Sequence, residues 1–116
     1  MATKVLICLY GNEVTPRFDL ATEVLIASID EDGKVRGERV VVLPQASAEM
    51  LCHMVLTESI QVVICGGIEE EYFQYLTWKR VSVLDSVIGD YKEALDRLAE
   101  GRLQAGDILV ERENFA

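Results

Sequence analysis

The chain has 116 residues, half of them hydrophobic, and twenty acidic residues against eleven lysines and arginines give a formal charge of −9. This length accommodates one domain but not two, and the hydrophobic fraction is sufficient for a single core without disulfide or metal cross-links. The acidic balance argues against binding of DNA, RNA or anionic lipid through a broad basic surface, because such binding requires clustered lysines and arginines. Any anionic ligand therefore needs a local basic site.

The first half of the chain predicts three strands. Val5–Tyr10 is a continuous run of β-forming residues closed by Gly11, as expected for a central strand that is buried on both faces. Residues 23–30 and 34–43 form two further strands, and Glu31-Asp32-Gly33 between them has the composition of a tight turn. These segments predict an antiparallel meander.

The second half alternates helices with strands. Ser47 can cap a helix that runs to about Glu58, and Asp90 and Glu93 form a capping-box-like pair at the start of a helix that Gly101 ends. Between these helices we expect a strand over 61–65, a helix over about 69–79 and a strand over 81–84. The predicted order is β-β-β-α-β-α-β-α, in one domain over residues 1–103.

This order predicts an α/β fold with a mixed five-stranded sheet and helices on both faces. Right-handed crossovers place the loop after Tyr10 and the Gly66-Gly67 turn at the same carboxyl edge of the sheet, where open α/β sheets bind ligands. Residues 104–116 form a C-terminal tail, in which Ile108-Leu109-Val110 can either add a strand or remain mobile.

Three cysteines, Cys8, Cys52 and Cys65, occur without any Cys-x-x-Cys pair, which is typical of a reducing compartment. The apolar stretch Val5–Tyr10 is too short for the hydrophobic region of a signal peptide or for a membrane span. The sequence therefore predicts a cytoplasmic protein without a membrane partner.

Catalytic motifs are missing from the sequence. It contains no dinucleotide-binding glycine loop, Walker loop, nucleophile elbow or His-Glu-x-x-His motif, and nothing aims the single histidine, His53, at a nucleophile. The element order also belongs to ribonuclease H-like folds, but here the central strands offer Cys8, Tyr10 and Cys65 in place of the carboxylates that a two-metal nuclease needs. We therefore expect a protein that is not an enzyme.

Three segments resemble a known family when taken in order. They are Val14-Thr15-Pro16-Arg17-Phe18-Asp19, Ile64-Cys65-Gly66-Gly67-Ile68 and Glu100-Gly101-Arg102-Leu103. In this order the chain, over roughly residues 4–103, resembles the dinitrogenase iron-molybdenum cofactor-binding (cofactor biosynthesis) family. The resemblance implies a ribonuclease H-like fold used for binding an iron-molybdenum or other iron-sulfur cluster, with nitrogenase assembly proteins as partners.

The family's first motif commonly has histidine-phenylalanine-glycine where this chain has Arg17-Phe18-Asp19. Arg17 cannot ligate a metal because it keeps its proton, but its guanidinium can hydrogen-bond an anionic cluster. The alternative for Arg17 is a solvated surface charge. Gly66 and Gly67 can bring backbone N–H groups to the same ligand, although the following Glu69-Glu70-Glu71 would repel it, and the alternative is a tight turn without a ligand.

Cys65 and His53 are the candidate metal ligands. Cys65 ends its strand beside the glycine turn and can offer a thiolate, or it is a core residue as we expect for Cys8 and Cys52. Helical projection places His53 with Met50 and Met54 on the side of their helix opposite its apolar stripe. Three interpretations of this side remain open: it contacts a soft metal, it binds a partner protein, or it touches another subunit or the C-terminal tail.

Four aromatic residues, Tyr72, Phe73, Tyr75 and Trp78, exceed what one buried helix face can use and indicate an interface, with a homo-oligomer as one expectation. Taken together, the sequence predicts a non-catalytic carrier or chaperone of an anionic metal-sulfur cluster in nitrogenase cofactor biosynthesis, held by Arg17, Gly66 and Gly67. The alternative is a protein-interaction or regulatory module that has lost cluster binding. The three glutamates and Arg17 favour the alternative, and the continuous motif order favours the carrier.

Overall fold

A computed structural model describes residues 2–109 of the chain as a mixed α/β fold with three α-helices. The helices are α1 (Ala48–Thr57), α2 (Glu70–Trp78) and α3 (Tyr91–Ala99), and a 3₁₀ turn, η1, spans Phe18–Leu20. The strands are β1 (Thr3–Tyr10), β2 (Glu13–Val14), β3 (Glu23–Ile29), β4 (Val35–Val42), β5 (Val62–Ile64), β6 (Ser82–Leu84), β7 (Ile88–Gly89) and β8 (Ile108–Leu109).

The main sheet has the order β4-β3-β1-β5-β6, with β2 paired to the end of β1. The β1–β3 and β3–β4 pairs are antiparallel, whereas the β1–β5 and β5–β6 pairs are parallel. The predicted mixed sheet is confirmed. The short strands β2, β7 and β8 depart from the predicted element order, and β7 pairs with β8 in a separate small parallel sheet.

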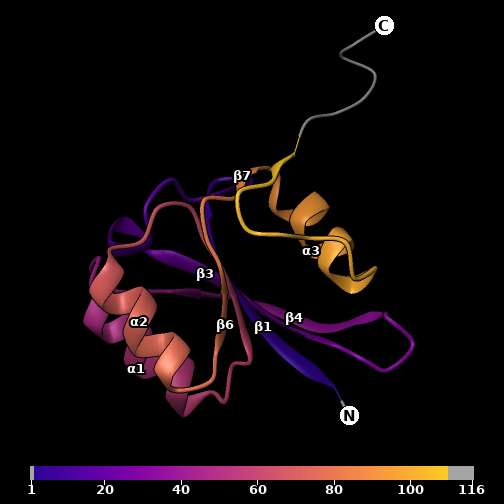
Figure 1. The fold of residues 1–116 in the computed structure, drawn as a ribbon, viewed down its shortest axis with the longest axis horizontal. Coiled ribbons are helices and arrows are strands. Elements are labelled where there is room, and N and C mark those ends of the chain that lie inside the picture. Colours follow the sequence, from indigo (N-terminus) through magenta and orange to yellow (C-terminus); the bar gives the residue numbers. More distant parts are fainter. Residues whose placement is uncertain (1, 110–116) are drawn as a thin grey trace, which may run out of the picture.

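Strand β1 lies at the centre and is buried on both faces, as its sequence predicts. Leu6 and Cys8 point into the core beneath α1 and α2, whereas Ile7 and Leu9 point into the core beneath α3. Figure 1 shows α1 and α2 together on one side of the sheet and α3 on the other. Helices therefore cover both faces, and each face has its own hydrophobic cluster.

The predicted turn and caps are present. The Gly33 N–H donates to the Asp30 carbonyl, and the φ angle of 78° at Gly33 is one that glycine adopts without strain. The Ser47 hydroxyl accepts from the Met50 N–H at 3.2 Å and caps α1. These local signals fix the β3–β4 hairpin and the start of α1.

Residues 104–109, the described part of the predicted tail, belong to the fold. Residues 104–109 include β8, and Leu109 is buried in the core on the α3 face. The described part of Ile108-Leu109-Val110 therefore adds a short strand, whereas Val110 and the rest of the predicted tail lie outside the described residues. Within residues 2–109, no helix has both the length and the apolar character needed to cross a membrane.

Candidate functional site

The loop after β1 meets the Gly66-Gly67 turn at the carboxyl edge of the sheet. The Phe18 N–H donates to the Gly67 carbonyl at 2.8 Å, and the Gly67 N–H donates to the Pro16 carbonyl at 2.7 Å. These two hydrogen bonds form an isolated parallel bridge between Arg17 and Gly67. The structure thus brings Arg17 to the Gly66-Gly67 turn, which lies about fifty residues further along the chain.

A pocket of about 360 Å³ lies beside this bridge. We call it the crevice; its lining residues are Glu13, Val14 and Pro16 from the first loop, Gly66 and Gly67 from the turn, and Ser86, Val87, Ile88 and Gly89. The third wall, formed by β7 and the connection that leads to it from β6, was not expected from the sequence. The signal for it was available, because Asp85-Ser86 and Gly89 punctuate the chain after the strand over 81–84.

Gly66 is required by the chain itself rather than by a ligand. A Cβ atom at this position would lie 2.4 Å from both the Thr15 and the Pro16 carbonyl oxygens. At Gly67 the nearest atom to such a Cβ is the Pro16 oxygen at 3.5 Å, which is ordinary van der Waals contact. The tight-turn interpretation therefore accounts for Gly66, while Gly67 is exposed at the crevice wall.

Arg17 is held by acidic neighbours. Its Nε and Nη2 atoms donate to the two carboxylate oxygens of Asp19, both at 3.0 Å, and Nη2 lies 3.9 Å from Glu69 Oε1. The side chain remains 55% exposed, and exposed ion pairs of this kind contribute little free energy. The guanidinium can therefore exchange Asp19 for another anion at small cost. The Asp19 partner was missed from sequence, although it lies only two residues away.

Cys65 points away from the crevice and into the core beneath α1 and α2. Burial raises the pKa of its thiol to about 12, and the Asp85 carboxylate adds to the rise. Cys8 and Cys52 lie in the same cluster, and burial raises the pKa of Cys52 to about 11. All three thiols therefore keep their protons at neutral pH, and their core placement agrees with what we expected for Cys8 and Cys52.

His53 lies apart from the crevice. It is exposed on α1 and lines two surface hollows, one between α1 and α2 and one over α1, neither of which includes Arg17, Gly66 or Gly67. In the described part of the chain, no three His, Cys, Asp or Glu side chains are grouped so that they could hold a metal ion. The structure therefore does not join His53 and Cys65 into one site.

The family model described as dinitrogenase iron-molybdenum cofactor matches residues 2–101. The chain belongs to this family. Membership of this family supports a cofactor-related role. No curated protein matches the chain in sequence.

Solved structures share the fold of this family member. PH0822 is 19% identical with a TM-score of 0.80, covering 89% of this chain and 94% of its own. A proposed dinitrogenase from Methanocaldococcus jannaschii, MJ0327, is 22% identical with a TM-score of 0.73 and coverages of 90% and 94%. A proposed NifB protein from Thermotoga, TM1290 of the DUF35 family, is 24% identical with a TM-score of 0.66 and coverages of 95% and 98%. At these identities the likeness establishes the fold alone.

For a member of the dinitrogenase iron-molybdenum cofactor family, the crevice offers hydrogen-bonding groups in place of metal ligands. Arg17 does not line the crevice but follows Pro16, which does, and it brings a positive charge to this loop, while the Gly66-Gly67 turn supplies backbone. Glu13 and Glu69 bring negative charge to the same region. The side chains present can therefore contact the outer atoms of an anionic cluster, while the thiol of Cys65 would have to leave the core to reach its metal ions.

Proposed function

We propose that this protein is a non-catalytic, cytoplasmic carrier that binds an anionic iron-molybdenum or iron-sulfur cluster as cargo in the crevice and passes it to a nitrogenase assembly protein. The family match over residues 2–101 carries this proposal. The geometry supports it through Arg17, whose backbone bridges to Gly67 and whose guanidinium is paired with the carboxylates of Asp19 and Glu69. An anionic cargo would replace Asp19 as the partner of Arg17.

A second function is favoured by a specific observation. Arg17 and Asp19 stand where the family pattern commonly has histidine and glycine, and in the structure these two residues bind each other. Cys65 is buried and protonated as well, so its thiol does not offer a metal ligand. On these grounds the second function is that of an interaction or regulatory module that has kept the fold and lost cluster binding.

Anaerobic gel filtration distinguishes the two functions. The purified protein is incubated with isolated iron-molybdenum cofactor under reducing conditions, and the protein fractions are analysed for iron and molybdenum. A carrier co-elutes with both metals, and Arg17→Ala lowers the amount bound because it removes the cation at the crevice. Arg36→Ala is the matched control, because Arg36 is an exposed arginine that pairs with Asp30 on the β3–β4 hairpin.

Absence of metal from the wild-type fractions would contradict the carrier function. The double variant Arg17→His/Asp19→Gly then tests the second function, because it restores the side chains that the family pattern has at these positions. Co-elution gained by the double variant but not shown by the wild type would mean that this chain has lost cluster binding through those two substitutions.

A further inference from the structure

The outer surface of α1 and α2 carries side chains that the crevice does not use. A hollow of about 470 Å³ lies between the two helices, and a second hollow of about 400 Å³ extends over α1. Both are lined by Glu49 and His53, so they adjoin and form one groove. We define the α1–α2 groove by Glu49, Met50, His53 and Leu56 of α1 and Glu71, Tyr72 and Tyr75 of α2.

Large apolar side chains surround this groove although the core beneath it is filled. Leu51, Val55 and Leu76 are completely buried between the helices and the sheet. On the outer side, Met50, Leu56 and Tyr75 are each more than a third exposed, and Trp78 is 80% exposed. Tryptophan and tyrosine are the residues that most often carry binding energy in protein interfaces.

The groove is also acidic. Between Arg39 and Lys79 the sequence contains five glutamates (Glu49, Glu58, Glu69, Glu70 and Glu71) and no lysine or arginine. Glu49 lines the groove from α1 and Glu71 lines it from α2. Partial desolvation and these carboxylates raise the pKa of Tyr72, as expected where the local field is negative.

The aromatic rings at one end of the groove already bind a cation. The Lys79 ammonium lies 5.7 Å from the centroid of the Tyr75 ring and 5.7 Å from that of Trp78. The two rings therefore form one site for a positive charge. A partner's lysine or arginine would take the place of Lys79 there.

We propose that the α1–α2 groove docks a basic amphipathic segment of another protein. An apolar side chain of the segment enters the hollow between the helices, and its lysines or arginines pair with Glu49 and Glu71 and lie over Tyr75 and Trp78. Charge complementarity selects this occupant: a second copy of the chain would bring its own net charge of −9 to an acidic surface. The groove shares no lining residue with the crevice, so docking does not depend on cluster binding.

Trp78 provides a direct readout, because it is the only tryptophan in the chain and shares the Lys79 ammonium with Tyr75 of the groove. The probe is a synthetic amphipathic helix of leucine and lysine, about five turns long, and the control probe has glutamate at every lysine position. We expect the lysine peptide to shift the Trp78 emission to shorter wavelength with saturable binding, because the peptide covers the indole. The glutamate peptide should leave the emission unchanged.

Paired variants separate docking from general attraction to an acidic protein. Glu49→Gln/Glu71→Gln should weaken binding of the lysine peptide by roughly threefold to tenfold, because it removes the two charges that line the groove. Glu38→Gln/Asp32→Asn removes the same number of charges from exposed residues of β4 and the β3–β4 turn. This control should change the affinity by less than about twofold, and circular dichroism verifies the fold of both.

Three results would overturn the proposal. If both double variants weakened peptide binding equally, the net charge of the protein alone would explain the affinity. Peptide binding without a change in Trp78 emission would place the contact elsewhere. A blue shift that grows with protein concentration in the absence of peptide would identify a second copy as the occupant. None of these results depends on whether the iron-molybdenum cofactor co-elutes, so a failure of the carrier function remains distinguishable.

Discussion

Gly66 and Gly67 are neighbours in the chain, but the structure makes different demands on them. Gly66 is buried under the carbonyl groups of Thr15 and Pro16, and these backbone atoms cannot move without displacing the whole loop. Gly67 lies at the wall of the crevice with room for a methyl group. Only the first glycine is therefore needed for the fold.

The substitution Gly66→Ala should lower the free energy of unfolding by about 3 kcal/mol, because the added methyl overlaps backbone oxygens. Gly67→Ala should change it by less than about 0.5 kcal/mol, since its methyl makes only ordinary contacts. Urea unfolding followed by circular dichroism measures both. Equal effects of the two substitutions would contradict the close approach at Gly66.

The buried thiols make stability depend on alkaline pH. The ordinary pKa of a cysteine thiol here is 9.0, whereas burial raises that of Cys65 to about 12. Between these values the unfolded chain loses the thiol proton and the folded chain keeps it, so the unfolded state is favoured as the pH rises. The stabilisation is complete below pH 9 and is lost progressively above it.

We therefore expect the free energy of unfolding to fall with a contribution from Cys65 of about 1 kcal/mol per pH unit above pH 9. Cys65→Ala should be less stable at neutral pH because it leaves a cavity, yet its stability should decline less steeply above pH 9. Denaturant titrations from pH 8 to about 11 compare the slopes. Lysines and tyrosines titrate in the wild type and in Cys65→Ala alike. Identical dependence of the unfolding free energy on pH in the two proteins would therefore show that burial does not raise the pKa of the Cys65 thiol.

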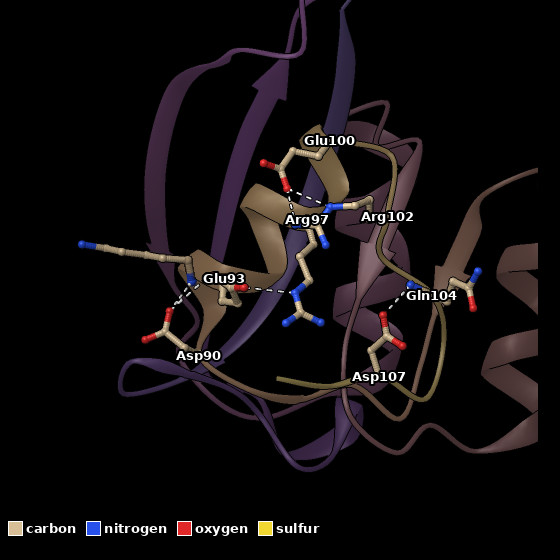
Figure 2. Close-up of polar contacts among 8 residues, drawn as sticks. Asp90, Glu93, Arg97, Glu100, Arg102, Gln104 and Asp107 are labelled. Carbon is tan, nitrogen blue, oxygen red and sulfur yellow. Dashed lines mark hydrogen bonds and ion pairs between the residues drawn. The ribbon is translucent and has the colours of Figure 1, made fainter. Parts of the chain in front are cut away.

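At the scale of the element, local polar contacts cap the start of α3 and hold the turn that follows it (Figure 2). The Asp90 carboxylate accepts from the Lys92 and Glu93 N–H groups at 2.7 and 3.1 Å, and Arg97 pairs with Glu93 one turn along the helix. After the helix, Asp107 accepts from the Gln104 N–H at 2.9 Å and holds the turn that leads into β8. The helix can therefore pack on the sheet with a defined start.

Removing the cap should destabilise the protein measurably. Asp90→Ala leaves two N–H groups at the start of α3 without their acceptor and should cost about 1 kcal/mol. Asp96→Ala is the control, because Asp96 is an exposed residue of the same helix with no capping contact. Thermal unfolding compares them, and an equal shift of the melting temperature in both would remove the capping explanation.

Sequence patterns identified the long elements and missed the short ones, because hydrophobic periodicity becomes visible only over several residues. In α1, the periodicity separates buried Leu51, Cys52 and Val55 from the outer side that carries Met50 and His53. Met54 was predicted on the outer side too, but it is partly buried against the core. By contrast, β2, β7 and β8 are two residues long and show no periodicity. They form because long-range contacts bring their backbones together.

For the whole molecule, stability depends on two hydrophobic clusters that share strand β1. Leu6 belongs to the cluster beneath α1 and α2, and Ile7 belongs to the cluster beneath α3. Both side chains are completely buried. The two faces of the sheet are therefore equally important to the fold, even though only one of them carries a pair of long helices.

Leu6→Ala and Ile7→Ala should each lower the free energy of unfolding by about 3 kcal/mol. Val42→Ala on the edge strand β4 should cost less than about 1 kcal/mol, because that side chain is 71% exposed. Guanidinium unfolding of the three variants tests this ranking. A small effect of Ile7→Ala alone would mean that α3 does not seal its face of the sheet.

The sequence by itself determined the mixed sheet, the three helices and the caps of α1 and α3, because these depend on periodicity and local turn chemistry. Only the tertiary structure decided the fate of the candidate site residues. Arg17 meets the glycine turn and is bound by Asp19, whereas Cys65 turns into the core and His53 lies in another groove. These outcomes depend on which strands become neighbours and on which way each side chain points at a strand end, and neither is encoded in spacing along the chain.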